Sequence, residues 1–297
     1  MPHDNVFTAG SLAKSYYEVA QWYGQNTDDI GARYVCQPFM GFGRMASAVL
    51  RDGITVDACD FQHLSWAIAK GVFNAEKVET NVDKPHYRQG KAYSGKLIKH
   101  MDERSAGFVD WVADEGTPLD VACVGMAIPG QTMRGWMSVW TGNFDKFYAK
   151  FEQIRDQCAK FIPMPGTLNF REIDFFRHSL EYDRHYDAII LDPPRLQPTR
   201  DSYSYGAWVK LNTCLGGDVK IKSWTNRNYF YLLSQTLAIQ SDYLLMTWSG
   251  EHPSAQDVKA SALALGELED EIVWEARQKT IYGWRINRKT KETHDNQ

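Results

Sequence analysis

The sequence predicts an α/β protein built on a doubly wound, mostly parallel sheet. Short apolar segments rich in Val, Ile and Leu alternate with longer segments of helical periodicity. A glycine-containing turn, MGFG, follows the first of these apolar segments. Two later segments, VDACD and DAIILD, end in an acidic residue. A repeated strand–turn–helix order is typical of right-handed β-α-β units that share one sheet.

The first quarter of the chain contains two such units after a leading helix. In chain order the expected elements are a helix over 11–24, a strand over 33–39, a helix over 44–53, a strand over 54–60 and a helix over 61–73. Gly24 is expected to end the first helix, and Gly53 is expected to stop the second. The MGFG turn separates the first strand from its helix.

The alternation of strands and helices is interrupted and then returns. From about 75 to 160 the pattern is irregular, with helix mixed with loop and many glycines and aromatic residues. The later elements are strands over 167–176 and 187–194, a helix around 227–240, a strand over 242–250, a helix over 254–266 and strands over 271–280 and 281–289. We therefore predict one α/β domain, 1–74 and 161–290, interrupted by an inserted module, 75–160. The tail 291–297 is expected to be disordered.

Bulk composition is that of a soluble globular protein. The 297 residues are 43% hydrophobic and 24% charged. No apolar run approaches the roughly 20 residues that a membrane helix needs, and the first residues do not resemble a secretory signal. The five cysteines are scattered without a CxxC pair, which argues against a disulfide framework or a metal site. A cytoplasmic location with no membrane partner is expected; the oligomeric state is not predicted.

One segment stands out against the net charge of −4. Residues 84–100, KPHYRQGKAYSGKLIKH, carry five Lys or Arg residues and no acid. Tyrosines lie among these charges, a mixture suited to phosphates and bases. We predict that Lys91, Lys96 and Lys99 contact nucleic acid; an ordinary solvated basic loop is the alternative.

Polar residues at four strand ends indicate a ligand site. Gly41 and Gly43 follow the first strand, where a backbone without Cβ atoms can approach a ligand closely. Asp60 ends the second strand about 20 residues later, where an acid accepts hydrogen bonds from ribose hydroxyls. Asp174 and Asp192 end the next two strands. A helix N-cap or a surface turn explains any one of these residues; together they favour an adenosine-containing ligand.

The order of these motifs resembles that of a known family. QPFMGFG comes early and LDPPR late, with VDACDFQHLSWAI and IDFF at the intermediate strand ends. In the insert, GQTMRGWMSVWTGNFDKFY completes the set. Over roughly 5–290 the chain resembles the alpha-class adenine-specific DNA methyltransferases, which use S-adenosylmethionine. Their motifs are acid-Pro-Phe-x-Gly-x-Gly and Asp-Pro-Pro-Tyr, with target recognition between them.

The resemblance implies a Rossmann-like methyltransferase fold, S-adenosylmethionine as cofactor and DNA as partner, with RNA as the lesser alternative. The residues that match the cofactor motifs are Lys14, Gln37, Pro38, Phe39, Gly41, Gly43, Asp60, Asp174 and Phe175. The catalytic motif is Asp192, Pro193, Pro194 and Arg195. Arg134 matches the family's insert segment. Three positions depart from the family: Gln37 replaces an acid, Lys14 lies in a partial Gly-Gly-Lys segment, and Arg195 replaces an aromatic residue.

The resemblance assigns Asp192 and the Pro193 carbonyl to the two N–H bonds of an adenine amine that has left the base stack. They turn its lone pair towards the methyl donor, mainly by orientation and electrostatics. A guanidinium in the pocket would repel the cofactor sulfonium by about 3 kcal/mol at roughly 5–6 Å and a dielectric constant of about 20. Arg195 is therefore expected to point outward. Tyr203 and Tyr205, with Trp208, are candidate substitutes for the stacking aromatic, and Lys222 continues a basic surface.

Three other functions remain open. A catalytically silent protein that binds cofactor or nucleic acid in a regulatory role fits the loss of the aromatic residue. Methylation of RNA or another amine fits the same cofactor site. DPPR also occurs in RNA uracil methyltransferases, which need a catalytic cysteine; Cys214 lacks their Asn-Pro context.

Overall fold

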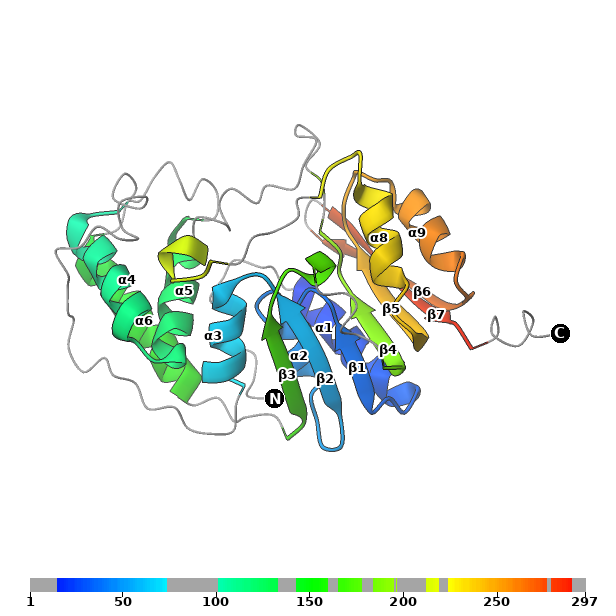
Figure 1. Ribbon diagram of the computed structural model, residues 1–297, viewed down its shortest axis with the longest axis horizontal. Helices are drawn as coiled ribbons and strands as arrows, with labels where there is room; N and C mark the ends of the chain where they lie inside the picture. Colours follow the sequence, from blue (N-terminus) through cyan, green and yellow to red (C-terminus); the bar gives the residue numbers. More distant parts are fainter. Residues whose placement is uncertain are drawn as a thin grey trace.

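A computed structural model describes residues 15–73, 101–132, 143–159, 165–177, 184–194, 196, 212–218, 224–276 and 279–289. Its seven strands are β1 (Tyr34–Gln37), β2 (Thr55–Asp60), β3 (Thr167–Glu172), β4 (Tyr186–Leu191), β5 (Ser241–Trp248), β6 (Glu267–Ala276) and β7 (Lys279–Asn287). They form one sheet in the order β3-β2-β1-β4-β5-β7-β6 (Figure 1). The first five strands in chain order are parallel, and β7 runs antiparallel to both neighbours. The predicted doubly wound, mostly parallel sheet is confirmed.

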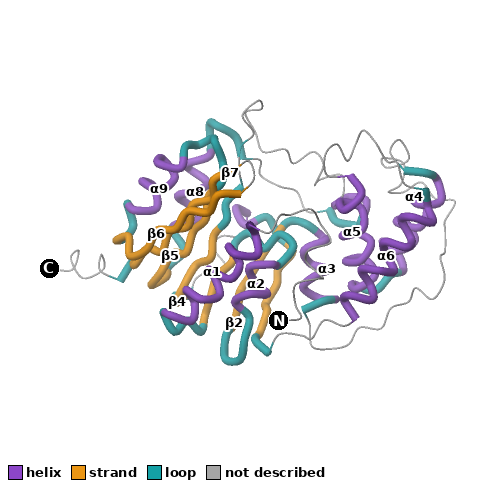
Figure 2. Tube along the Cα trace, turned by 180° about the vertical axis from the view of Figure 1, so that it is seen from behind, coloured by secondary structure: helices purple, strands orange, loops and turns teal. Residues whose placement is uncertain are grey.

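Helices cover both faces of the sheet. They are α1 (Ser15–Asp29), α2 (Arg44–Val49), α3 (His63–Gly71), α4 (Glu103–Glu115), α5 (Pro118–Thr132), α6 (Phe144–Ala159), α8 (Tyr229–Leu237) and α9 (Ala255–Leu263), with a short 3-10 helix, η2 (Phe175–Arg177). Figure 2 shows α1 and α2 on one face, and Figure 1 shows α8 and α9 on the other. Two clusters of buried side chains correspond to these two layers.

The first helix is longer than predicted. It continues through Gly24 to Asp29 instead of ending at the glycine. A Cβ atom on Gly24 would lie 2.6 Å from the Ala48 carbonyl oxygen of α2. Gly24 therefore allows two helices to approach closely, a role that local sequence does not distinguish from a helix stop.

The second helix is shorter than predicted. It ends at Val49, because Leu50 leaves it in an extended conformation and buries its side chain in the core. Gly53 lies further on, in the turn before β2, with φ of +77°. The predicted break between the last two strands is also misplaced, since β6 ends at Ala276 and pairs there with Lys279.

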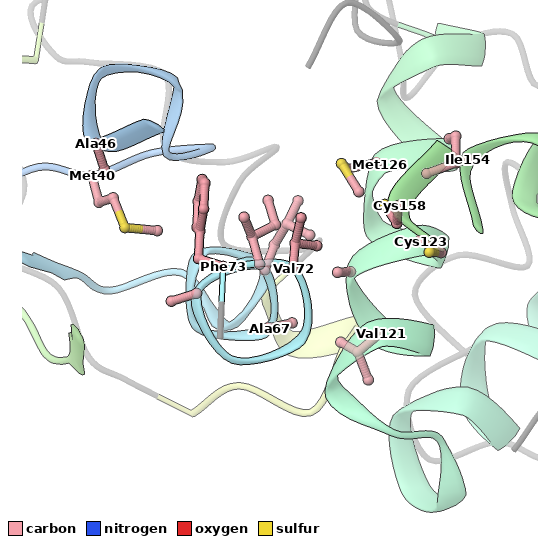
Figure 3. Close-up of a cluster of buried hydrophobic side chains, with 14 of the residues drawn as sticks. Met40, Ala46, Ala67, Val72, Phe73, Val121, Cys123, Met126, Ile154 and Cys158 are labelled. Atoms are coloured by element: carbon pink, nitrogen blue, oxygen red, sulfur yellow. The ribbon is translucent and has the colours of Figure 1, made fainter. Parts of the chain in front are cut away.

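The described parts of the insert, 101–132 and 143–159, are mainly helical, and the rest of the segment predicted as helix mixed with loop lies outside the described residues. Helices α4, α5 and α6 lie beside α3 at the β3 end of the sheet (Figure 1). Figure 3 shows Met40 and Phe73 in the same cluster of buried side chains as Cys123 of α5 and Cys158 of α6. The insert therefore shares its apolar core with the α/β layer. Its role in target recognition stays a prediction.

Two further findings concern the described residues. None of their helices is long and apolar enough to cross a membrane. All five cysteines are buried, and none of them forms a disulfide. The tail 291–297 lies outside the described residues.

Candidate active site

The predicted site lies at the topological switch point of the sheet. Strand β1 lies between β2 and β4, so the chain leaves it in one direction and returns on its other side. The connection from β1 to β2 runs through α2 on one face, whereas the connection from β4 to β5 runs through α8 on the other. In open α/β sheets, ligands bind in the crevice outside the carboxyl ends of such a strand pair.

The glycine turn lies on one side of this switch point, after β1. The Met40 N–H donates to the Cys59 carbonyl at 3.0 Å, and the Gly43 N–H donates to the Met40 carbonyl at 3.0 Å. Gly41 and Gly43 have φ values of +54° and +76°, which disfavour other residues. A Cβ atom on Gly43 would lie 2.5 Å from the Phe73 ring, whereas one on Gly41 would meet nothing within 4 Å. Gly43 is thus needed for packing, and the space beside Gly41 is open.

Asp60 holds this turn in place. Its Oδ2 accepts the Gly41 N–H at 2.8 Å, and its Oδ1 accepts the Gln62 N–H at 3.0 Å. The side chain is buried, and burial raises the pKa of Asp60 to about 6 although these backbone hydrogen bonds oppose the rise. The neighbouring charge of Asp174 raises it further. A carboxylate has about four acceptor positions, so acceptor capacity remains for a ligand.

An aromatic cluster supports the third strand end. Asp174 is buried after β3, and its Oδ1 accepts the Phe176 N–H at 3.2 Å. The Phe39 ring lies 5.9 Å from that of Phe175 and 5.8 Å from that of Trp224, in edge-on arrangements. Phe39 and Phe175, both predicted as cofactor residues, therefore pack against each other between β1 and β3.

Gln37 ends β1 with an unused acceptor. The side chain is 1% exposed. Its Nε2 donates weakly to the Phe39 carbonyl at 3.5 Å, and its Oε1 has no hydrogen-bond partner among the described residues. A buried acceptor without a donor is costly, and a ligand donor at this position would remove that cost.

Asp192 lies on the other side of the switch point, directly after β4. It is half-buried, and its Oδ1 accepts the Thr247 hydroxyl at 3.4 Å. Leu196 follows the two prolines and pairs with His252 in an isolated bridge. This bridge connects the Asp192 turn to the loop after β5.

The structure brings together the predicted residues that it describes. They are Gln37, Pro38, Phe39, Gly41, Gly43, Asp60, Asp174, Phe175, Asp192, Pro193 and Pro194, all at the carboxyl ends of β1 to β4. The other predicted residues lie outside the described ranges: Lys14, Lys91, Lys96, Lys99, Arg134, Arg195, Tyr203, Tyr205 and Lys222. Sequence reasoning missed Thr247, and it missed Tyr23, whose hydroxyl lies beside Thr247. Neither belongs to a recognisable motif.

Two observations concern other sites in the described part of the chain. No group of three or more His, Cys, Asp or Glu residues there is arranged to hold a metal ion. A groove of about 440 Å³ lies at the opposite edge, where β1 and β2 begin, and Arg33, Arg51 and Gly53 are among its lining residues. It is separate from the switch point.

Comparisons with known proteins were made for both sequence and structure. No family model and no curated protein matches the chain. Among solved structures, the "Crystal structure of TrmN from Thermus thermophilus" is similar, with a TM-score of 0.38 and 12% sequence identity. The similarity covers 92% of this chain and 48% of that chain, so the protein spans about half the length of that structure. Similarity this low says nothing about substrate or reaction.

Proposed function

We propose that the protein transfers a methyl group from S-adenosylmethionine to the exocyclic amino group of adenine in DNA. One observation carries the proposal. The glycine turn with Asp60 and the Asp192-Pro193-Pro194 segment lie on the two sides of one switch point, at the ends of β1 and β4. A cofactor on the first side and a target amine on the second would meet in the crevice between them.

The residues on the β1 side fit the cofactor. Open space beside Gly41 admits a ligand close to the backbone. Asp60 retains acceptor positions for the ribose hydroxyls. The Gln37 Oε1, which has no hydrogen-bond partner among the described residues, suits a charged donor such as the cofactor's ammonium group. When bound, S-adenosylmethionine supplies a methyl group made electrophilic by the sulfonium.

The residues on the β4 side fit an amine. The lone pair of the adenine amine is delocalised into the ring, which makes the amine a poor nucleophile. The Asp192 carboxylate accepts one N–H and the Pro193 carbonyl accepts the other, so that the nitrogen turns towards tetrahedral geometry. One N–H proton must leave as the N–C bond forms, and the Asp192 carboxylate is the acceptor at that position.

Nucleic acid as the partner is supported by the first turn of α8. Phe230 is 43% exposed and Tyr231 57% exposed, and the exposed Arg227 lies in the turn just before the helix. The Tyr229 ring connects this surface to the site, since it lies 5.6 Å from the Phe230 ring and 4.9 Å from that of Trp224. The segment 219–241 contains no acidic residue. Exposed rings beside cationic side chains suit stacked bases and phosphates.

Two of the alternative functions, uracil methylation and silent binding, can be compared with specific residues. Cys214 is fully buried, which does not fit a nucleophile that must reach a uracil ring. A silent, cofactor-binding protein is favoured by one sequence feature, Arg195 in place of the aromatic residue. In a silent protein, the residues on the β1 side would bind the cofactor in the same way.

Transfer of tritium from labelled S-adenosylmethionine to DNA and to RNA tests the proposal, with cofactor binding measured by calorimetry. Incorporation into DNA is expected. Incorporation into RNA alone would reassign the substrate. Cofactor binding without incorporation would make the protein a silent binder, and gain of transfer in Arg195→Tyr would identify the missing aromatic residue as the reason. Absence of cofactor binding would overturn the proposal.

A further inference from the structure

A buried tyrosine of α1 reaches the end of β4, although none of the predicted motifs includes it. Tyr23 has no exposed surface. Its hydroxyl donates to the Leu191 carbonyl at 2.8 Å and lies 2.9 Å from the Thr247 hydroxyl. Thr247, itself 2% exposed, donates to Asp192 Oδ1 at 3.4 Å. These side chains therefore connect α1, β5 and the residue proposed to hold the amine.

We infer that Tyr23 and Thr247 are positioning residues that orient the Asp192 carboxylate. The inference rests on the proposed function, in which Asp192 accepts an N–H of the target amine. A hydrogen bond to Oδ1 restricts rotation of the carboxylate, so that its acceptor positions stay directed into the crevice. The distance of 3.4 Å exceeds that of a usual O–H···O bond, but hydrogen bonds of active sites often shorten when substrate binds.

The count of protons supports this role. Each of the two hydroxyls has one proton to donate. The Tyr23 proton has the Leu191 carbonyl and Thr247 Oγ1 as its acceptors, which leaves the Thr247 proton for Asp192 Oδ1. The Thr247 proton favours this carboxylate, because a charged acceptor forms the stronger hydrogen bond.

The helix that carries Tyr23 is held on both sides. Arg51 donates from Nη2 to the Gly24 carbonyl and to the Thr27 hydroxyl, each at 2.9 Å. On the other side, Arg285 donates from Nη1 to Asn26 Oδ1 at 3.0 Å. The Tyr23 hydroxyl is therefore fixed relative to the sheet.

Variants of the full chain with nearly unchanged side-chain shape distinguish two roles for these hydroxyls. Either they orient the Asp192 carboxylate, or they only satisfy each other's hydrogen bonds in the core. Thr247→Val removes the hydroxyl and keeps the shape, Thr247→Ser keeps the hydroxyl, and Tyr23→Phe removes only the phenolic oxygen. For each, kcat and KM for methyl transfer to DNA are measured. The 13C NMR signal of the Asp192 carboxyl carbon is recorded in the free protein and assigned by its loss in Asp192→Asn.

The inference predicts that Thr247→Val lowers kcat by about ten- to a hundredfold. KM should stay unchanged, and the Asp192 carboxyl signal should move. Tyr23→Phe should change both readouts in the same direction, whereas Thr247→Ser should keep them close to wild type. Equal loss of kcat in the Val and Ser variants, or an unmoved signal in both hydroxyl-deleted variants, would overturn the inference. If the wild type methylates neither DNA nor RNA, the proposed function fails, and the signal alone decides the inference.

Discussion

The two sides of the switch point are held by different kinds of interaction. On the β1 side, the glycine turn is fixed by backbone hydrogen bonds and by Asp60, which lies 19 residues along the chain from Gly41. On the β4 side, Asp192 accepts a hydrogen bond from the Thr247 hydroxyl, 55 residues away, and the Thr247 hydroxyl contacts that of Tyr23, 224 residues away. The cofactor half is thus built from local sequence, whereas the amine half is completed by the tertiary fold.

The largest expected effect is at the glycine turn. Gly41→Val places a side chain in the open space beside the turn and should abolish S-adenosylmethionine binding in calorimetry. Gly53→Val is the matched control, because Gly53 also has a positive φ and an unobstructed Cβ position but lies at the other edge of the sheet. Both variants should lose similar stability from backbone strain, roughly 1–2 kcal/mol. Wild-type affinity in Gly41→Val would show that the ligand is not bound there.

A second prediction concerns the pH dependence of Asp60. Because burial raises its pKa from 3.8 to about 6, the protonated form favours the folded state. Its contribution to stability is present in full below pH 3.8 and is lost as the pH rises through 6. The shift corresponds to about 3 kcal/mol. In urea unfolding, the free energy of unfolding of Asp60→Asn should rise relative to that of wild type by up to this amount between pH 4 and 7.

Asp242 provides a control of opposite sign. Burial opposes its ionisation, but hydrogen bonds from His185 and Lys289 outweigh burial and lower its pKa. Asp242→Asn should therefore lose stability relative to wild type as the pH rises from 3 to 5. If the free energies of unfolding of Asp60→Asn and wild type differed by the same amount from pH 4 to 7, the raised pKa of Asp60 would be contradicted. Cofactor affinity should also fall below pH 6, since ribose hydroxyls donate best to an ionised Asp60.

The α8 surface predicts a smaller effect on nucleic-acid affinity. Tyr231→Ala should weaken binding of single-stranded DNA by about 1–3 kcal/mol if a base stacks on this ring. Tyr34→Ala is the control, because Tyr34 is also exposed, by 48%, but starts β1 at the opposite edge. Fluorescence anisotropy measures both. Equal affinities in the two variants would exclude α8 from the binding surface.

The smallest expected effect concerns the basic segment of the insert. Replacement of Lys91, Lys96 and Lys99 by Ala should reduce the slope of log affinity against log salt by about 0.9 for each phosphate that the variant no longer neutralises. Cofactor binding should not change. An unchanged slope in a salt titration would leave these lysines as ordinary solvated side chains.

Sequence reasoning reached the features that depend on neighbours along the chain. The apolar periodicity located the strands, and the glycine turn and acidic strand ends located the ligand edge. It failed at Gly24, where the close approach to Ala48 overrides the usual role of a glycine as helix stop. It also missed Tyr23, whose partners on β4 and β5 lie 168 and 224 residues away. Long-range interactions leave no periodic pattern in a single sequence, so the support behind Asp192 could be found only in the fold.

Methyl transfer by wild type and Asp192→Ala, compared side by side, tests the central claim most directly. DNA is incubated with each protein and S-adenosylmethionine and is then digested to nucleosides. The nucleoside of N6-methyladenine is quantified by mass spectrometry. The account predicts product from the wild type and a loss of at least about a hundredfold in the variant, at unchanged cofactor affinity. Undiminished product formation by Asp192→Ala would contradict the assignment of the amine to the end of β4.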